Sequence, residues 1–540
     1  MAVFPAGQHS SLLIIYLARD RKGRNSMAVK TFAAIDIGSY ELSMKIFEVS
    51  KSKGMKEIDH IRHSIDMGTE TYSTGKLSYE RVDELCRILR QFTDIMKAYQ
   101  VETYKAYGTS AIRETRNKAI LLDQIRQRTG IKIDVLSNSE QRFLNYKSIA
   151  FQGEGFQKII ENGTAILDIG GGSIQVSLFD KDTLISTQNM KLGVLRLHER
   201  VNHLGVSLSK YDMLIEEIVE SQMMVYKKLY LKDREIKNII IVDDYISALV
   251  RKHNVNSGIR GYADRDMLNS FMKDCRTKSM AELAKNLDMP LENMPLLYIS
   301  MILLQRIMDN MGAEQIWAPG VTLCDGIAYE YAEKNKVIAS AHDFEKDIIA
   351  CAQNISKRYR GSKRRSETLE QIALTIFDSM KRVHGLEKRE RLLLQLSTIL
   401  HDCGKYISMA NLGECSYSII MATEIIGLSH TEREIVANVV KYNHLEFDYY
   451  EIMGKFSTMD KESYLKIAKL TAILRIANGL DRSHKQKFKN VKVSLKEDQL
   501  LITVDTGEDI TLETGLFGAR AAFFEEVYSV RPVIRRKRTL

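Results

Sequence analysis

The pattern of hydrophobic and polar positions changes character twice along the chain. Residues 31–336 mix short apolar or alternating stretches with stretches of helical spacing, which is typical of α/β proteins. Residues 337–488 have helical spacing almost throughout, and residues 489–540 contain alternating stretches followed by one helical stretch. The pattern therefore predicts an α/β lobe at 31–155, a second at 156–336, an all-helical domain at 337–488 and a small α+β unit at 489–540.

Inside the first lobe the spacing predicts individual elements. Two strands with a turn between them are expected at 31–50, and further strands at 56–68, at 103–112 together with an exit loop, and at 132–137. Helices are expected at 77–101, 116–130 and 139–153. The helix at 116–130 ends on Gly130, a residue that readily adopts the left-handed conformation of a helix cap.

Two hairpins share one layout, which indicates an internal duplication. In both, an apolar strand reaches an Asp-Ile-Gly turn, passes a small residue and leaves as an alternating strand; the turns are Asp36-Ile37-Gly38 and Asp168-Ile169-Gly170. Because glycine leaves backbone N–H groups accessible, such turns can bind phosphate. Two of them facing each other across a cleft would clamp a chain of phosphates.

The second turn, in "LDIGGGSIQVSLF", combines several groups suited to phosphate chemistry. Gly170, Gly171 and Gly172 lie between Asp168, whose carboxylate suits a metal or a water, and the hydroxyl of Ser173. Gln175 follows two residues later, where a second carboxylate would be useful. The position of Gln175 raises the question of whether the protein performs chemistry on a phosphate or only binds it.

Composition narrows the class of protein only slightly. The 540 residues are 44% hydrophobic and 27% charged, and the net charge of +9 fits a polyanionic ligand without requiring one. Six cysteines without a CxxC motif predict reduced thiols and a cytoplasmic protein, and no apolar run has membrane-spanning length. Residues 1–30 are predicted to be a leader, either disordered or preceding a true start at Met27, and the basic end "IRRKRTL" is expected to be solvated.

Six motifs in order carry a family resemblance: "AAIDIGSYELSMKI", "YGTSAIRETRN", "LSNSEQRFLNYKSIAF", "LDIGGGSIQVSLF", "KLGVLRLHE" and "GVTLCDGIAYEYA". On these residues the chain after Met27 resembles the exopolyphosphatase / guanosine pentaphosphate phosphatase (Ppx/GppA) family. The resemblance implies two actin-like (ribonuclease H-like) lobes. Through "LSTILHDCGKYI" the helical domain resembles the HD-type domain of longer members.

The resemblance also implies an activity. The family removes the terminal phosphate of inorganic polyphosphate, or the 5′ γ-phosphate of pppGpp, by in-line attack of a water, usually with Mg²⁺ and without an organic cofactor. It further implies a homodimer, with no membrane and no specific nucleic acid as partner. The matching phosphate-binding positions are Asp36, Gly38, Ser39, Arg113, Gly170, Gly171, Gly172 and Ser173, with Asp168 as the expected Mg²⁺ ligand.

The chain departs from the family pattern at both expected catalytic carboxylates. A pattern like "ISGxEEAR" is here "LSNSEQRF", which keeps Glu140 but places Gln141 at the expected base, and "GGGSTEL" is here "GGGSIQV", which gives Gln175. A glutamine cannot accept a proton at neutral pH. Asp243-Asp244-Tyr245 replaces an expected "SGT" turn, and Tyr40-Glu41 replaces Asn-Ser in the first loop.

The HD-type metal pattern is incomplete as well. His401 and Asp402 are present, but the upstream histidine position offers Arg365 and Ser366, and the distant aspartate position holds Asn478 with Asp481 three residues later. His384 and His444 are further possible ligands. A helical packing and dimerisation domain without metal is favoured over a metal centre at His401 and Asp402.

Two hypotheses of different class follow. The first is a phosphohydrolase of the exopolyphosphatase type, weakened by the two glutamines, in which Glu140 or Asp168 helps position the water. The alternative is a non-catalytic sensor or scaffold that binds polyphosphate or a nucleotide. A kinase-like transferase is disfavoured, because its adenosine-binding turn usually needs glycines and "VDDYIS" supplies none.

Overall fold

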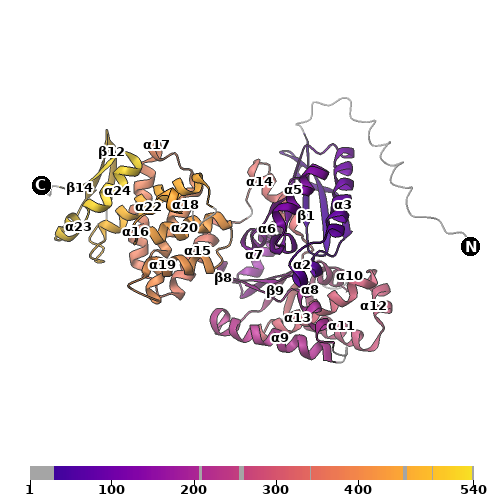
Figure 1. The fold of residues 1–540 in the computed structure, drawn as a ribbon. Helices are drawn as coiled ribbons and strands as arrows, with labels where there is room; N and C mark the ends of the chain where they lie inside the picture. Colours follow the sequence, from indigo (N-terminus) through magenta and orange to yellow (C-terminus); the bar gives the residue numbers. More distant parts are fainter. Residues whose placement is uncertain are drawn as a thin grey trace, which may run out of the picture.

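The computed structural model of the chain describes residues 29–205, 210–253, 261–340, 342–453, 459–488 and 491–537. The leader predicted at 1–30 lies outside the described residues except for residues 29 and 30. Figure 1 shows two α/β lobes on one side of the molecule and the helical domain with its small sheet on the other.

The first lobe is built on a five-stranded sheet in the order β3-β2-β1-β4-β5. Strand β1 pairs antiparallel with β2 and parallel with β4, and both faces of β1 are covered, since Phe32, Ala33, Ala34 and Ile35 are fully buried. The predicted hairpin is confirmed. The strands are β1 (Lys30–Ile37), β2 (Glu41–Ser50), β3 (Gly54–Ser64), β4 (Thr103–Gly108) and β5 (Asp134–Val135).

The three helices predicted for the first lobe are present as α3, α5 and α6, and three short helices, α2, α4 and α7, were not predicted. Ser78 caps the long helix α3, and Gly130 ends α5 in the left-handed conformation with φ 75°. The segment expected as an exit loop after β4 is instead a short helix, α4. The helices are α2 (Gly68–Thr74), α3 (Tyr79–Ala98), α4 (Ser110–Glu114), α5 (Lys118–Thr129), α6 (Asn138–Ala150) and α7 (Glu154–Ile160).

The second lobe repeats the topology of the first. Its six-stranded sheet has the order β10-β11-β9-β6-β7-β8, and β6 pairs antiparallel with β7 and parallel with β9, as β1 does with β2 and β4. The strands are β6 (Thr164–Ile169), β7 (Ile174–Asp180), β8 (Thr183–Met190), β9 (Asn238–Val242), β10 (Tyr262–Asp264) and β11 (Gln315–Trp317). The duplication predicted from the two hairpins therefore extends to the sheets.

Helices cover the second sheet, and the last of them returns to the first lobe. They are α8 (Val194–His203), α9 (Tyr211–Tyr226), the π-helical turn η2 (Lys227–Leu231), α10 (Asp244–His253), α11 (Arg265–Thr277), α12 (Met280–Leu287), η3 (Leu291–Asn293), α13 (Met294–Met311) and α14 (Leu323–Lys334). Helix α14 packs on α6 and β1, and Asp325 on it binds Lys45 of β2 at 2.9 Å. The end of the segment assigned to the second lobe thus belongs spatially to the first.

None of the helices in the described residues is by itself long and apolar enough to cross a membrane. Only the pair formed by α12 with the segment Leu291–Met311 passes that test jointly, and its two halves are bent by 109°. All six cysteines are free thiols, and Cys86, Cys324, Cys351 and Cys403 are buried.

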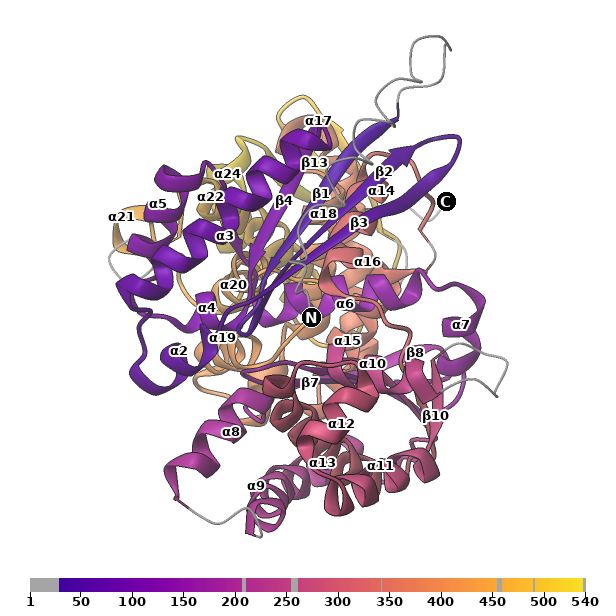
Figure 2. The same cartoon turned by 90° about the vertical axis from the view of Figure 1, so that its right-hand side faces the viewer.

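The third part of the chain is helical, as predicted. Its elements are α15 (Phe344–Arg358), α16 (Lys363–Ser379), α17 (Lys381–His384), α18 (Lys388–Leu400), η4 (Cys403–Tyr406), α19 (Leu412–Ala422), α20 (His430–Tyr442), α21 (Tyr450–Met453) and α22 (Lys461–Leu480). Figure 2, turned by 90°, shows these helices behind the two lobes.

The C-terminal unit differs from its prediction at two places. Residues 511–513, expected as the end of an alternating stretch, belong instead to helix α23 (Thr511–Gly515). The basic end is exposed at Arg535, Arg536 and Lys537, as expected, but part of it also forms strand β14, which pairs parallel with the edge of β13 that β12 leaves open. The elements are β12 (Val491–Lys496), β13 (Gln499–Val504), α23 (Thr511–Gly515), α24 (Gly518–Tyr528) and β14 (Arg531–Arg536).

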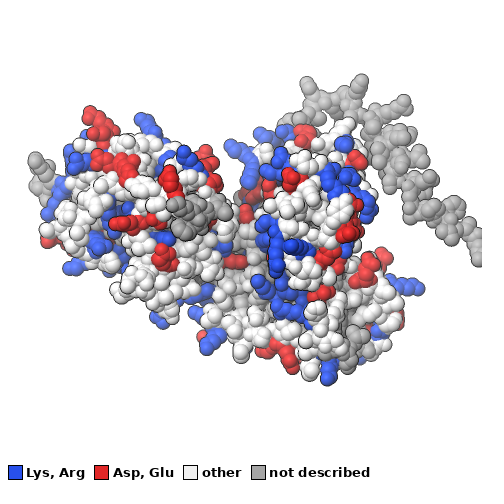
Figure 3. Space-filling view, viewed as in Figure 1, with Lys and Arg blue, Asp and Glu red and all other residues white. Residues whose placement is uncertain are grey.

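Charged side chains give no face of a single sign in the view of Figure 3. Lysines and arginines are interspersed with aspartates and glutamates over both the lobes and the helical domain. The net charge of +9 is therefore not by itself a guide to a binding site, which has to be located from individual contacts.

Candidate functional site

The two glycine turns meet between the lobes. A Cβ built on Gly171 would lie 3.2 Å from Cβ of Ser39, so the first turn touches the second directly. Ser39 is buried, and its hydroxyl lies 2.8 Å from the hydroxyls of both Tyr72 and Ser110. The structure thus brings together the two predicted phosphate loops.

The second turn keeps two of its three glycine N–H donors available, while the Gly170 N–H donates to Ser173 O at 3.0 Å. Its carbonyl groups are used: Val194 N–H donates to Gly170 O, Arg196 N–H to Gly171 O and Arg196 Nε to Gly172 O. Among the described residues, the N–H groups of Gly171 and Gly172 have no hydrogen-bond partner. This arrangement, with bound carbonyls and unbound N–H groups, is what an anion-binding turn requires.

Tyr72, which the sequence analysis did not single out, lies against the second turn. A Cβ on Gly172 would overlap the Tyr72 hydroxyl, so that position has room only for a glycine. Arg196 lies over the Tyr72 ring at 4.5 Å and pairs with Glu114 of the first lobe at 2.7 Å. These contacts connect α8 of the second lobe to α2 and α4 of the first.

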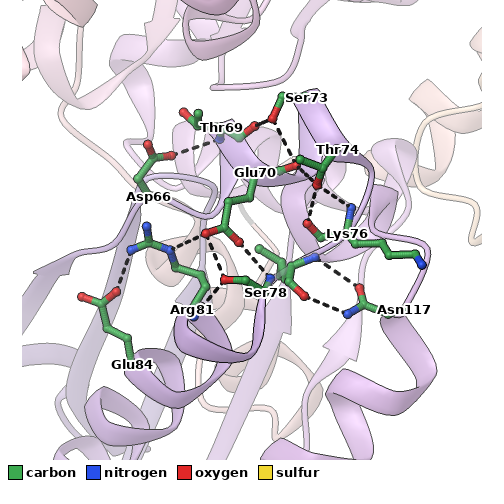
Figure 4. Close-up of polar contacts among 11 residues, drawn as sticks. Asp66, Thr69, Glu70, Ser73, Thr74, Lys76, Ser78, Arg81, Glu84 and Asn117 are labelled. Carbon is green, nitrogen blue, oxygen red and sulfur yellow. Dashed lines mark hydrogen bonds and ion pairs between the residues drawn. The ribbon is translucent and has the colours of Figure 1, made fainter.

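A polar network holds helix α2, and with it Tyr72, in place (Figure 4). The Glu70 carboxylate accepts hydrogen bonds from the Ser78 N–H at 2.9 Å and from its hydroxyl at 3.1 Å. Asp66 accepts from the Thr69 N–H at 3.0 Å at the start of the helix, and Arg81 lies 3.6 Å from Glu70. Helix α2 is short, so these bonds rather than helix propensity fix its position.

Arg113, predicted to face a phosphate, lies beside Gln141. Its Nη1 donates to Leu136 O at 2.8 Å and to Gln141 Oε1 at 3.4 Å. Burial lowers the pKa of Arg113, and the negative charges of Glu114, Glu424 and Asp168 oppose that shift. An arginine in this setting stays charged and offers a donor fork to a phosphate.

Glu140 does not face this group, because its carboxylate caps a helix. Glu140 Oε2 accepts from the Ser137 N–H at 2.9 Å, and the Ser137 hydroxyl accepts from the Glu140 N–H at 3.2 Å. This reciprocal pair is a capping box at the start of α6. The expectation that Glu140 helps position a water therefore finds no support in its contacts.

Asp168 and Gln175 lie opposite each other in the β6–β7 pair. Asp168 Oδ2 accepts from Asn145 Nδ2 at 2.6 Å, and Gln175 Oε1 accepts from Arg142 Nε at 3.1 Å. Arg142 Nη2 lies 2.7 Å from Glu424 Oε2, a carboxylate from the loop between α19 and α20 of the helical domain. Arg142, Asn145 and Glu424 are thus site residues that sequence reasoning missed.

The two other departures from the family pattern have local structural roles. Asp243 Oδ1 accepts from the Ile246 N–H at 2.6 Å and so caps α10, and Ser300 donates to its other oxygen at 3.3 Å. In the first loop, Glu41 pairs with Arg62 at 3.6 Å, and burial raises the pKa of Tyr40.

The helical domain places Arg365 beside the HD-type residues. Arg365 Nε donates to Asp481 Oδ2 at 3.2 Å, and Arg365 Nη2 donates to Asn478 Oδ1 at 2.6 Å. His401 is fully buried and donates from Nδ1 to Thr398 O at 2.8 Å, and its Nε2 lies 3.7 Å from Asp402 Oδ2. His444 bonds to the His401 carbonyl, and His384 bonds to Phe377 O, so neither completes a ligand set.

Neither predicted metal position fits a divalent ion in its present contacts. In the described part of the chain, no three His, Cys, Asp or Glu side chains converge as ligands. Oxygens of Asp168 and Gln175 already accept N–H groups, and a guanidinium stands next to Gln175 and next to Asn478. An arginine where a cation would bind repels that cation.

A cavity of about 910 Å³ lies where α6, α7, the start of α15 and α18 meet. Its cationic side chains already have carboxylate partners: Lys147 binds Glu333, Lys388 binds Glu345 and Arg389 binds Glu432. The cavity therefore resembles a charged domain junction more than a phosphate site.

Two family models match the chain. The model described as "Ppx/GppA phosphatase family" matches residues 46–335, and the model "Ppx/GppA phosphatase, domain III" matches residues 349–516. Together they cover most of both lobes and of the helical domain, but the first glycine turn precedes residue 46 and lies outside both.

Individual proteins are similar at lower identity. The guanosine-5'-triphosphate,3'-diphosphate pyrophosphatase of Photobacterium profundum is 22% identical over 493 residues, which are 88% of this chain and 91% of that protein. Exopolyphosphatase 1 of Mycobacterium leprae is 26% identical over 144 residues, 26% of this chain and 41% of that protein. The crystal structure of an exopolyphosphatase from Cytophaga hutchinsonii ATCC 33406 is 17% identical, covers 57% of this chain and 99% of that one, and superposes with a TM-score of 0.47.

Proposed function

The chain belongs to the Ppx/GppA phosphatase family, and we propose that it binds a phosphoanhydride chain between its lobes and hydrolyses the terminal phosphate slowly. The substrate class is inorganic polyphosphate or a guanosine polyphosphate such as guanosine-5'-triphosphate,3'-diphosphate. In this proposal the two α/β units act as actin-like lobes and the helical part as an HD-like domain without metal. A homodimer in the cytoplasm stays a prediction of the resemblance.

One observation carries the proposal: the two glycine turns touch, and the N–H groups of Gly171 and Gly172 have no partner among the described residues. These donors and the guanidinium of Arg113 can bind phosphate oxygens and stabilise the negative charge that develops during in-line attack. The hydroxyls of Ser39, Ser110 and Tyr72 lie at the same place, where they hydrogen-bond to one another at 2.8 Å.

Proton transfer is the weak part of this site. Gln141 and Gln175 keep the shape of glutamates but cannot accept the proton of an attacking water. The remaining carboxylates have other contacts, since Glu140 caps α6 and Asp168 accepts a hydrogen bond from Asn145. General-base help is worth about 10²- to 10⁴-fold in rate, so turnover well below that of a glutamate-bearing site is expected.

The non-catalytic alternative rests on a different observation. Gln175 accepts a hydrogen bond from Arg142, whose partner Glu424 belongs to the helical domain. A ligand that alters this contact would be sensed by the helical domain without any turnover. Ligand-induced stabilisation with no phosphate release would favour this function.

The test measures phosphate release from long-chain polyphosphate and from guanosine-5'-triphosphate,3'-diphosphate. Gln141→Glu restores a carboxylate beside Arg113 and is expected to raise the rate by about 10- to 100-fold. Gln124→Glu makes the same chemical change on the exposed side of α5 and should change nothing. Failure of the unaltered protein and of both Gln141→Glu and Gln175→Glu to release any phosphate would refute hydrolysis and leave the binding function.

A further inference from the structure

The guanidinium of Arg142 is the least expected group in the interlobe site. The residue is 3% exposed, and its Nε and Nη2 contact Gln175 and Glu424 as described above. Its Nη1 is buried and has no hydrogen-bond partner among the described residues. A buried charged donor without an acceptor lowers the stability of the folded protein. The Nη1 group therefore needs an acceptor oxygen that the described residues do not provide.

We propose that Arg142 supplies the positive charge that a divalent ion would otherwise bring, so that this site binds a phosphoanhydride ligand without Mg²⁺. The inference rests on the proposed function, in that it concerns the same ligand at the same place. It assigns Arg142 a direct contact with a phosphate oxygen.

Other polar atoms near Gln175 also lack partners. Gln175 lies opposite Asp168 on one side and opposite Asn189 on the other. The side-chain oxygens of Asn189 and of Asn145 are buried and unpaired among the described residues. Several unsatisfied polar groups around one guanidinium indicate a place built for a polar ligand or for ordered water.

The charge around this place matches one guanidinium better than one divalent ion. Mg²⁺ prefers six oxygen ligands with carboxylates among them. Here Gln141 and Gln175 are neutral, and the oxygens of Asp168 and Gln175 already accept N–H groups. The guanidinium of Arg142 would repel a divalent cation placed next to it, whereas a phosphate oxygen can accept a hydrogen bond from its unpaired Nη1.

Glu424 completes the arrangement from the helical domain. Its carboxylate neutralises Arg142, and only 17% of its side chain is exposed. A phosphate oxygen would compete with Glu424 for the same guanidinium, because both are anionic acceptors for a planar donor fork. Removal of the Glu424 charge is therefore expected to strengthen ligand binding.

The test is calorimetric titration of the full-length protein with inorganic tripolyphosphate, once in excess EDTA and once in excess Mg²⁺. Binding in EDTA at least as tight as in Mg²⁺ is expected. Arg142→Met should weaken binding in EDTA by about 10- to 100-fold, the cost of one charged hydrogen bond, and Glu424→Gln should tighten it. Arg391→Met, which removes an arginine paired with Asp378 in the helical domain, is the control and should bind normally.

The outcomes separate the two proposals. Binding that needs Mg²⁺ overturns the role of Arg142 and leaves the proposed function standing. Absence of binding in both buffers overturns both. The comparison of the two buffers uses the unaltered protein, so the need for Mg²⁺ is decided even if Arg142→Met does not fold. Arg142→Lys, which keeps the charge but loses the planar donor fork, then tests Arg142 itself and should also weaken binding in EDTA.

Discussion

Amide side chains lie beside buried guanidinium groups at two separate places in this protein. In the cleft Gln175 accepts from Arg142, and in the helical domain Asn478 accepts from Arg365. The family resemblance predicts a carboxylate at each of these amide positions. A guanidinium carries one positive charge and a divalent ion carries two, so exchanging the ion for an arginine is balanced by the loss of one carboxylate. In this structure each guanidinium has a carboxylate partner, Glu424 for Arg142 and Asp481 for Arg365, as buried charges require.

The capping role of Glu140 leads to a prediction at the same scale. Glutamine serves at this position of a capping box as glutamate does, so Glu140→Gln should leave both turnover and stability nearly unchanged. Glu140→Ala should lower the free energy of unfolding by about 0.5–1 kcal/mol without a specific loss of rate. Urea unfolding and phosphate release on both variants check this. A large loss of rate in Glu140→Gln alone would show that Glu140 acts as the base.

Sequence reasoning located the site residues that lie in the duplicated turns and missed those that arrive from elsewhere. Ser39 and Gly171 are recognisable from the layout of the two turns, and Arg113 from the family resemblance of its motif. Tyr72 and Glu424 come from segments without any local signal, and only the packing of α2 and of the helical domain places them at the cleft. Arg142 directly follows Gln141 in the sequence, yet its partners Gln175 and Glu424 are distant in the sequence and are known only from the structure.

At the scale of elements, periodicity predicted the hairpins and the long helices, because they follow one period over many residues. The five-residue helix α4 was missed, since a helix of that length is stable only through its tertiary contacts. Strand β14 was missed because Arg535, Arg536 and Pro532 are untypical of a strand. The proline is tolerated because β14 lies at the edge of its sheet. Both errors have one cause, which is that a distant partner overrides the local pattern.

An edge strand of the first lobe carries a pH-sensitive contact. His60 of β3 shares its Nε2 with the Ser43 hydroxyl at 2.8 Å and accepts from Arg62 Nε at 3.2 Å. Burial, together with the charges of Arg62 and Lys45, lowers the pKa of His60 to about 4. Because the ordinary pKa is about 6.5, the unfolded chain gains a proton first as the pH falls, and the contribution of His60 to stability is lost between those values.

The expected outcome is a lower urea midpoint for the unfolding of the first lobe at about pH 5 than at about pH 7.5. His60→Gln keeps an acceptor for Arg62 and should flatten this pH dependence. His203→Gln, at an exposed position on α8, should leave it as steep as in the unaltered protein. Equal steepness in all three proteins would remove His60 as the cause.

At the scale of the whole molecule, the helical domain is joined to the lobes by a shared core. One continuous cluster of buried residues runs from Tyr146, Phe156 and Phe179 of the lobes into the helices of the third domain. Polar contacts cross the same junction, including Arg142 with Glu424 and Asn354 Nδ2 with Leu184 O at 3.1 Å. An apolar junction of this kind favours unfolding of the parts together rather than one by one.

Asp347 is the polar centre of that junction and provides the test. It is fully buried at the start of α15, and its Oδ2 accepts from Tyr146 on α6 at 2.5 Å and contacts His342 Nε2 at 2.7 Å. Asp347→Asn should weaken both contacts, lower the free energy of unfolding by about 2–3 kcal/mol and separate the melting of the helical domain from that of the lobes. Asp378→Asn removes a partly exposed carboxylate paired with Arg391 inside the helical domain, and its effect should stay below about 1 kcal/mol. Differential scanning calorimetry of both variants is the measurement. If Asp347→Asn melts in a single transition whose midpoint is shifted no more than that of Asp378→Asn, the apolar core alone holds the domains together.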